Sequence, residues 1–150
     1  MTEIAFYHLT RSPLEAVLPK LLERTQAAGK RALILVGSAE RVEALNAHLW
    51  SYDQNSWLPH GSAKDGNGPE QPIWLTETDE NPNGAEFLFL TDGMAAADPG
   101  NFERCFDLFD GHDEQAVAAA RTRWRALKEA GHELTYWQQN EQGKWEEKGG

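Results

Sequence analysis

The fold of this chain is decided by residues 3–50, which read EIAFYHLTRSPLEAVLPKLLERTQAAGKRALILVGSAERVEALNAHLW. Glu3–Leu9 is apolar and aromatic, and Arg31–Val36 is nearly continuously apolar, as buried parallel strands are. Between them, leucine and valine recur every three or four residues from Pro13 to Ala28, which predicts a helix. The same spacing predicts a second helix over Ala39–Trp50. This strand–helix–strand–helix order is typical of a parallel α/β sheet.

The rest of the chain extends this pattern less regularly. A long polar, glycine-rich stretch at Ser51–Gln71 predicts a loop. Strong or short apolar runs predict further strands at 72–76, 86–90, 105–109 and 133–138, and the polar end at 140–150 predicts a tail. We therefore expect one α/β domain over residues 1–150, with a mostly parallel sheet flanked by helices. Pro19 falls inside the first helix and should bend it or shift its start.

Composition and charge exclude several classes of protein. Fourteen basic residues face 24 acidic ones, giving a net charge of −10, whereas a dedicated nucleic-acid binder needs a concentrated basic surface. A single cysteine, Cys105, cannot form an internal disulfide. No stretch approaches the roughly 20 apolar residues of a membrane helix. The N-terminus resembles no signal peptide, so we expect a cytoplasmic protein.

One helix has a charge that is out of character for an acidic chain. Residues 112–137 read HDEQAVAAARTRWRALKEAGHELTYW. On a helix at about 100° per residue, the apolar side chains that share one face are Val117, Ala120, Trp124 and Leu127. Three cations lie directly beside that face, namely Arg121, Arg125 and Lys128, while Arg123 points elsewhere. The cluster is either a solvated helix face or a docking site for an acidic partner.

Motifs for nucleotide, metal or covalent chemistry are missing. The first strand–helix turn, LTRSP, contains no glycine for a pyrophosphate, and VGSAE lacks the Lys-Ser/Thr pair of a P-loop. The five histidines are scattered, and His112 near Asp110 and Asp113 is better explained by helix capping than by a metal. We therefore expect no cofactor, no metal and no catalytic site. The alternative is a small enzyme in which His60 works with Asp53 or Asp65.

Aromatic side chains gather at the end of the second helix and in the long loop. Trp50, Tyr52 and Trp57 lie close together in the sequence. Tyr and Trp are common anchors of protein interfaces, but they can equally pack the loop onto the core. Both interpretations stay open.

Two stretches resemble the chi subunit family of bacterial DNA polymerase III. The more specific one is Leu49-Trp50 followed by Trp57-Leu58-Pro59-His60 within LNAHLWSYDQNSWLPHG, and the other is Arg121-Thr122-Arg123-Trp124-Arg125. The resemblance spans nearly the whole chain. It implies a Rossmann-like fold without a nucleotide site, and an accessory subunit that is not catalytic.

The resemblance also implies two partners. One is the psi subunit, which tethers chi to the clamp loader and would contact Trp57, Leu58 and Pro59. The other is the acidic C-terminal tail of single-stranded-DNA-binding protein, which ends in a phenylalanine. The residues implied at or near the tail-binding side are Trp50, Val117, Arg121, Trp124, Arg125 and Lys128, with Asp110 also on its flank.

The helix has the chemistry that such a tail requires. A terminal phenylalanine presents a ring and a carboxylate together, and the Val117/Trp124 edge can take the ring. Arg121 or Arg125 can bind the carboxylate through two hydrogen bonds. A third hypothesis is direct binding of single-stranded DNA by this helix, which predicts a steep dependence of affinity on salt.

Overall fold

The computed structural model describes residues 2–52, 59–62 and 65–148 of the 150-residue chain. Short 3-10 turns lie at Gly68–Glu70 and Pro99–Asn101. The helices are α1 (Leu14–Ala27), α2 (Ala39–Ser51) and α3 (Glu114–Glu129). The strands are β1 (Glu3–Leu9), β2 (Ala32–Leu35), β3 (Gly61–Ser62), β4 (Ile73–Thr76), β5 (Phe87–Leu90), β6 (Arg104–Asp110), β7 (Glu133–Gln139) and β8 (Trp145–Lys148).

The described strands form one sheet in the order β3-β4-β2-β5-β6-β1-β7-β8. All neighbouring pairs are parallel except β7 and β8, which are antiparallel. The prediction of a mostly parallel sheet flanked by helices is therefore confirmed.

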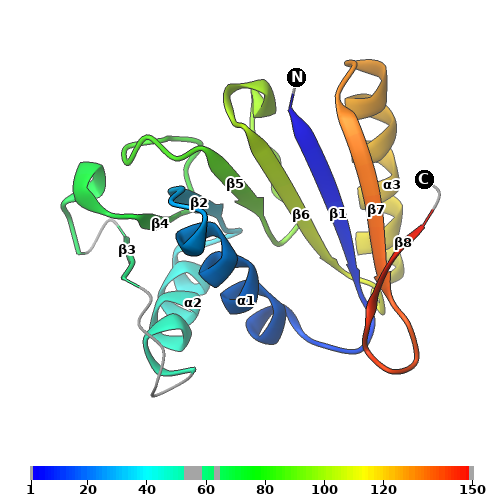
Figure 1. The fold of residues 1–150 in the computed structure, drawn as a ribbon, viewed down its shortest axis with the longest axis horizontal. Coiled ribbons are helices and arrows are strands. Elements are labelled where there is room, and N and C mark those ends of the chain that lie inside the picture. The colour runs from blue at the N-terminus through cyan, green and yellow to red at the C-terminus, as the bar shows by residue number, and fades with distance from the viewer. Residues whose placement is uncertain (1, 53–58, 63–64, 149–150) are drawn as a thin grey trace.

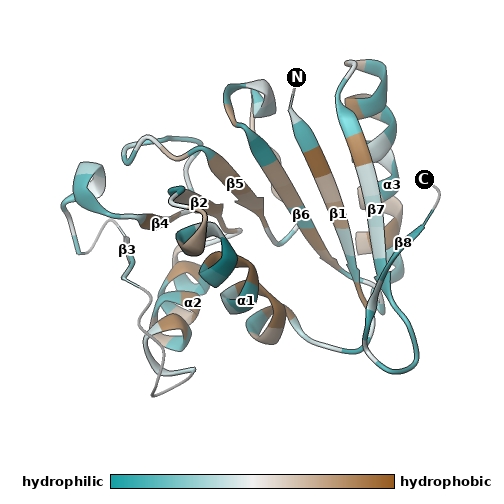
Figure 2. Ribbon diagram, in the orientation of Figure 1, coloured by the Kyte–Doolittle hydropathy of each residue, from teal (hydrophilic) through white to brown (hydrophobic). Residues whose placement is uncertain are grey.

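Helices cover both faces of the sheet (Figure 1). α1 and α2 lie on one face, and α3 lies on the other. In β1 the side chains alternate between two buried clusters: Ala5 and Leu9 pack with α1 and α2, whereas Ile4 and Phe6 pack with α3. Because both faces are covered, the short inner strands β2 and β5 are apolar along their whole length (Figure 2).

Two predicted irregular segments contain regular structure. The stretch expected as one loop, Ser51–Gln71, contributes β3 to the edge of the sheet and a 3-10 turn. The expected tail, 140–150, contains β8, which pairs with β7 so that Trp145 lies opposite Gln139. Trp145 packs edge-on against Tyr7, with ring centroids 5.0 Å apart. The strand was missed because only one of its four residues is apolar.

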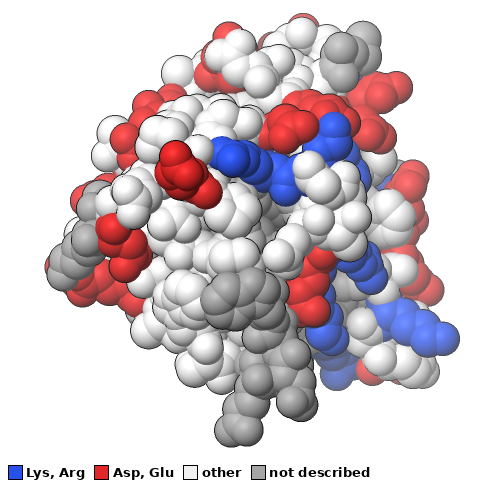
Figure 3. Space-filling view, turned by 60° about the vertical axis from the view of Figure 1, so that its left-hand side comes forward, with Lys and Arg blue, Asp and Glu red and all other residues white. Residues whose placement is uncertain are grey.

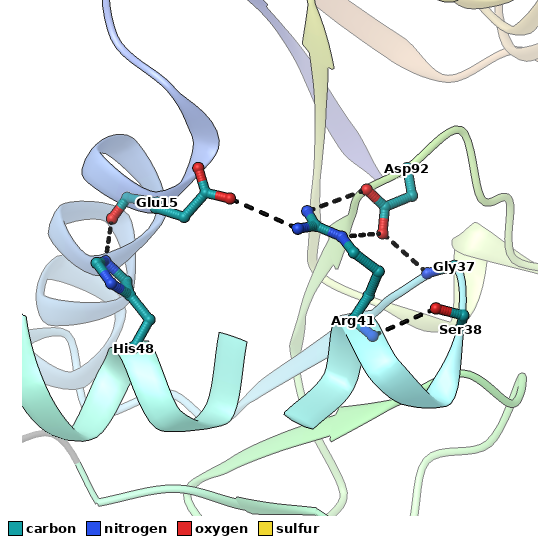
Figure 4. A network of polar contacts seen from close by, with 6 residues as sticks. All are labelled: Glu15, Gly37, Ser38, Arg41, His48 and Asp92. Carbon is teal, nitrogen blue, oxygen red and sulfur yellow. Dashed lines mark hydrogen bonds and ion pairs between the residues drawn. The ribbon is translucent and has the colours of Figure 1, made fainter. Parts of the chain in front are cut away.

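Pro19 lies inside α1 without shifting its start. Proline has no N–H, so the carbonyl of Glu15, four residues earlier, loses its helical hydrogen bond. His48 of α2 replaces it, with Nε2 donating to the Glu15 carbonyl oxygen at 2.6 Å (Figure 4). The proline thus creates an acceptor through which the two helices are joined.

This replacement can be tested by a double-mutant cycle. His48→Ala should lower the free energy of unfolding by about 1–2 kcal/mol, because it leaves the Glu15 carbonyl without a partner. In the Pro19→Ala background the amide of residue 19 supplies the bond, so His48→Ala should cost less than half as much. Urea denaturation of the four proteins measures both costs. Equal costs in the two backgrounds would contradict the explanation.

Candidate functional site

Helix α3 is positioned by its ends. Asp113 caps the N-terminus, its carboxylate accepting the backbone N–H groups of Gln115 at 3.0 Å and Ala116 at 3.3 Å. This confirms the predicted capping for Asp113, whereas Asp110 accepts the backbone N–H of His112 in the turn before the helix. Lys128 lies in the last turn, and Gly131 follows with a φ of +91°, a conformation that glycine adopts without strain.

The four residues predicted to share the apolar face of α3 all pack toward the sheet. Ala120 is buried, and Val117, Trp124 and Leu127 are partly buried against the same cluster. The Trp124 ring meets Phe6 edge-on at 5.3 Å and Tyr136 edge-on at 5.8 Å between centroids. Trp124 therefore packs on the sheet while its remaining edge reaches the surface.

Arg123 is the cation whose position the sequence did not explain. It turns inward, and its Nε and Nη2 donate to the two carboxylate oxygens of Asp107 at 2.7 and 2.9 Å. The Asp107 side chain is only 2% exposed, and the Arg123 side chain 14%. Burial raises the pKa of Asp107, while the hydrogen bonds and charge of Arg123 oppose that rise. This ion pair fixes α3 to β6.

The three predicted cations remain at the surface. Arg121, Arg125 and Lys128 are all exposed, and none forms an ion pair with another described residue. They lie on the flank of α3 beyond Trp124, which faces Tyr136 of β7. We call Val117, Arg121, Trp124, Arg125, Lys128 and Tyr136 the α3–β7 surface. It combines an apolar edge with unpaired positive charge.

Two members of this neighbourhood were missed from the sequence, Tyr136 and His8. The Tyr136 hydroxyl and His8 Nδ1 are 2.6 Å apart. The His8 ring also packs against the Phe109 ring at 5.1 Å and against the backbone of Gly111, where a Cβ would overlap it. Side chains alternate along β7, which places Tyr136 on the same face as Leu134, toward α3. The pairing of β7 with β1, which brings Tyr136 close to His8, could not be predicted from either strand alone.

The structure separates Trp50 from the α3–β7 surface. Trp50 lies near the end of α2, on the opposite face of the sheet, and is 51% exposed. Its ring packs against the His60 ring in a tilted arrangement, with centroids 4.1 Å apart. Trp50 thus lies near the segment that contains Pro59, a half-buried residue. The other residues predicted to contact psi, Trp57 and Leu58, lie outside the described residues. A single site containing Trp50 and Arg121 is not formed.

The alternative catalytic residues that the structure describes form structural contacts. His60 is 3% exposed, and its Nε2 lies 3.0 Å from the Asn46 carbonyl oxygen, as a structural histidine does. Asp65 accepts the backbone N–H and hydroxyl of Ser62, which stabilises a local turn. Asp53 lies outside the described residues. His60 therefore packs the β3 segment onto α2.

A crevice of about 810 Å³ opens at the carboxyl ends of β1 and β6, where the chain after β1 leads to α1 on one face of the sheet and the chain after β6 leads to α3 on the other. Related α/β folds bind nucleotides at such a point. Here Asp92 holds the start of α2: its carboxylate accepts the Gly37 N–H at 3.0 Å and pairs with Arg41 (Figure 4). A phosphate at this helix end would meet a carboxylate of like charge.

Metal and membrane features can be stated for the described residues. No group of three or more His, Cys, Asp or Glu side chains there could hold a metal ion. None of the described helices has the length and apolar character needed to cross a membrane.

Comparisons with known proteins identify the family. The sequence model of a family described as DNA polymerase III chi subunit, HolC, matches residues 1–135. The chain is also similar to the probable DNA polymerase III subunit chi of Rickettsia prowazekii (strain Madrid E), with 30% identity over 90 residues. That alignment covers 60% of this chain and 54% of the relative, so the chain spans about half the length of this curated relative. Since the family model matches most of its 150 residues, the chain belongs to the DNA polymerase III chi subunit family.

Proposed function

We propose that this chain is an accessory subunit of DNA polymerase III in DNA replication. In this role it joins the psi subunit of the clamp loader to the acidic C-terminal tail of single-stranded-DNA-binding protein. The tail binds the α3–β7 surface. The observation that carries the proposal is that three exposed cations, none of them paired with a residue that the structure describes, adjoin the partly buried Trp124 and Tyr136 rings.

The chemistry of the surface matches an acidic peptide that ends in an aromatic residue. The terminal ring packs beside Trp124, and the terminal carboxylate pairs with the Arg121 guanidinium. Upstream aspartates meet Arg125 and Lys128. Such a short contact supports micromolar affinity, about −8 kcal/mol, that weakens as salt is added. The net charge of −10 repels bare DNA, so the surface selects a protein tail.

The psi subunit binds the opposite side of the sheet, around Trp50, Trp57, Leu58 and Pro59. An exposed tryptophan next to Pro59 supports this assignment. Viewed toward the β3 edge, the molecule has a wide uncharged area, with Lys and Arg side chains lying beside Asp and Glu around it (Figure 3). Trp50 thus belongs to this psi-facing side, and the two partners can bind at the same time.

The proposed function is tested with a labelled peptide ending in Asp-Ile-Pro-Phe. Wild-type protein should bind it, and should not bind the same peptide without the phenylalanine. Arg121→Ala should weaken binding by about 1–3 kcal/mol, because the carboxylate loses its charged partner. Thermal stability should change by less than about 0.5 kcal/mol, since Arg121 is exposed. Fluorescence anisotropy and calorimetry measure the two effects.

The chain offers two matched controls for this test. Arg24→Ala removes an exposed arginine from α1, on the other face of the sheet, and should bind the peptide like wild type. Trp50→Ala should also bind it like wild type, because Trp50 lies away from α3. Wild-type affinity in Arg121→Ala would remove the proposed site, and equal binding of the peptide lacking phenylalanine would remove tail recognition.

A further inference from the structure

The hydrogen bond between His8 and Tyr136 lies at the edge of the α3–β7 surface. It joins β1 to β7 at 2.6 Å. Tyr136 also contacts Trp124, which forms the wall of the proposed ring slot. Tyr136 is the first residue beyond the part of the chain that the family model matches. This pair therefore has to be interpreted from the structure itself.

The position of the proton on the His8 ring sets the direction of its hydrogen bond to Tyr136. The Nε2 edge of the ring lies against the backbone of Gly111, and Nδ1 faces the Tyr136 hydroxyl. In the neutral tautomer that carries its proton on Nε2, Nδ1 accepts and the Tyr136 hydroxyl donates to it. In that tautomer the hydroxyl proton of Tyr136 is directed inward, away from any ligand.

Charged groups from several elements act on this pair. Burial is the largest cause that lowers the pKa of His8, and Arg121 of α3 and His112 add to the effect. Asp110 at the end of β6 opposes it. Arg121 also lowers the pKa of the Tyr136 hydroxyl, against a larger rise from burial. Arg121 lies three residues before Trp124 on α3, so it is on the part of the helix that Tyr136 contacts.

We propose that His8 and Tyr136 complete the site at which Arg121 binds a carboxylate. Binding of the carboxylate is then coupled to protonation of His8. This inference rests on the proposed tail binding and adds the residues that recognise the terminal carboxylate. When His8 takes up a proton, Nδ1 donates to the Tyr136 oxygen. The Tyr136 hydroxyl is then released to donate to the ligand, and His8 adds a positive charge beside it.

The direction of the pH dependence follows from linkage. A carboxylate at Arg121 cancels the charge that disfavours the His8 cation, so it raises the pKa of His8. The complex then holds more protons than the free protein, and affinity rises as pH falls through and below 6.5, the ordinary pKa of histidine. The aspartates of the peptide do not change their charge in this range.

The experiment measures the affinity of the labelled Asp-Ile-Pro-Phe peptide at pH 8.0, 6.5 and 5.5 and constant ionic strength. Wild-type affinity should rise by about threefold to tenfold from pH 8.0 to 5.5, a tenfold gain corresponding to one unit of pKa. His8→Leu should abolish most of this gain, and Tyr136→Phe should reduce it. His132→Gln changes a histidine at the far end of α3 and should keep the full gain.

A second measurement uses only the wild-type protein, in case a variant fails to fold. The peptide with an amidated C-terminus should show no gain at low pH, and NMR titration of the His8 ring should show its pKa rising when the free-acid peptide binds. Binding that is equally strong at all three pH values would overturn the inference and leave the proposed function intact. Absence of binding at every pH would overturn both.

Discussion

Arg123→Leu is expected to lower the free energy of unfolding by about 3–5 kcal/mol, one of the two largest effects we predict. The substitution leaves the Asp107 carboxylate, 2% exposed, without either of its hydrogen bonds to the guanidinium. Arg125→Leu, two residues along the same helix but exposed, should change the free energy by less than about 0.5 kcal/mol. Chemical denaturation measures both variants, and similar losses in the two would contradict a special role for the buried pair.

The loss of stability caused by Arg123→Leu should become larger as pH rises. Asp107 has a raised pKa in the folded protein, so between 3.8 and that raised value the folded state holds a proton that the unfolded state releases. Stability therefore falls as pH rises through this range. Without Arg123 the pKa of Asp107 rises further, because burial still raises it and the opposing effect of Arg123 is gone. Arg123→Leu should consequently lose less stability near pH 4 than at pH 7.

Replacing both partners separates charge burial from packing. In Asp107→Leu/Arg123→Leu neither charge remains, so most of the lost stability should return, as is common when a buried ion pair is exchanged for apolar side chains. The pair also connects α3 to β6. The affinity of the double variant for the tail peptide therefore shows whether binding requires the ion pair itself or only the correct position of α3.

Most elements of this fold could be predicted from local patterns, except β3 and β8, but the order of the strands could not. The continuous apolar run at Arg31–Val36 and the leucine spacing of α1 directly reflect burial on both faces of the sheet. The strand order places β1 between β6 and β7, pairs that depend on residues about 100 or more positions apart. No local pattern specifies such pairing.

The candidate site was predictable to the extent that it lies on one helix. Helical spacing correctly placed Arg121 beside Trp124, because both belong to α3. The partner of Arg123 is Asp107 on β6, and His8 contributes from β1, so neither could be found from the helix. Trp50 was grouped with the helix by resemblance, and the sheet between α2 and α3 keeps them apart. Residues joined only by tertiary packing were the ones missed or misplaced.

Trp124→Ala is expected to have the other large effect, because this side chain serves the core and the surface together. Removing the ring takes away its contacts with Phe6 and Tyr136 and should lower the free energy of unfolding by about 3–5 kcal/mol. Tail-peptide binding should fall as well. Trp50→Ala is the matched control, since its ring is 51% exposed, and it should cost no more than about 1 kcal/mol.

Trp124→Phe distinguishes the two roles of the side chain. A phenylalanine ring can keep the edge-on contact with Phe6, so this variant should retain most of the stability that Trp124→Ala loses. It is shorter at the rim, where the terminal ring of the peptide packs, so its affinity should still fall. Chemical denaturation and peptide titration of the same samples measure both quantities. If Trp124→Phe lost stability but bound the peptide normally, Trp124 would belong to the core alone and the ring slot would have to be formed by Val117 and Tyr136.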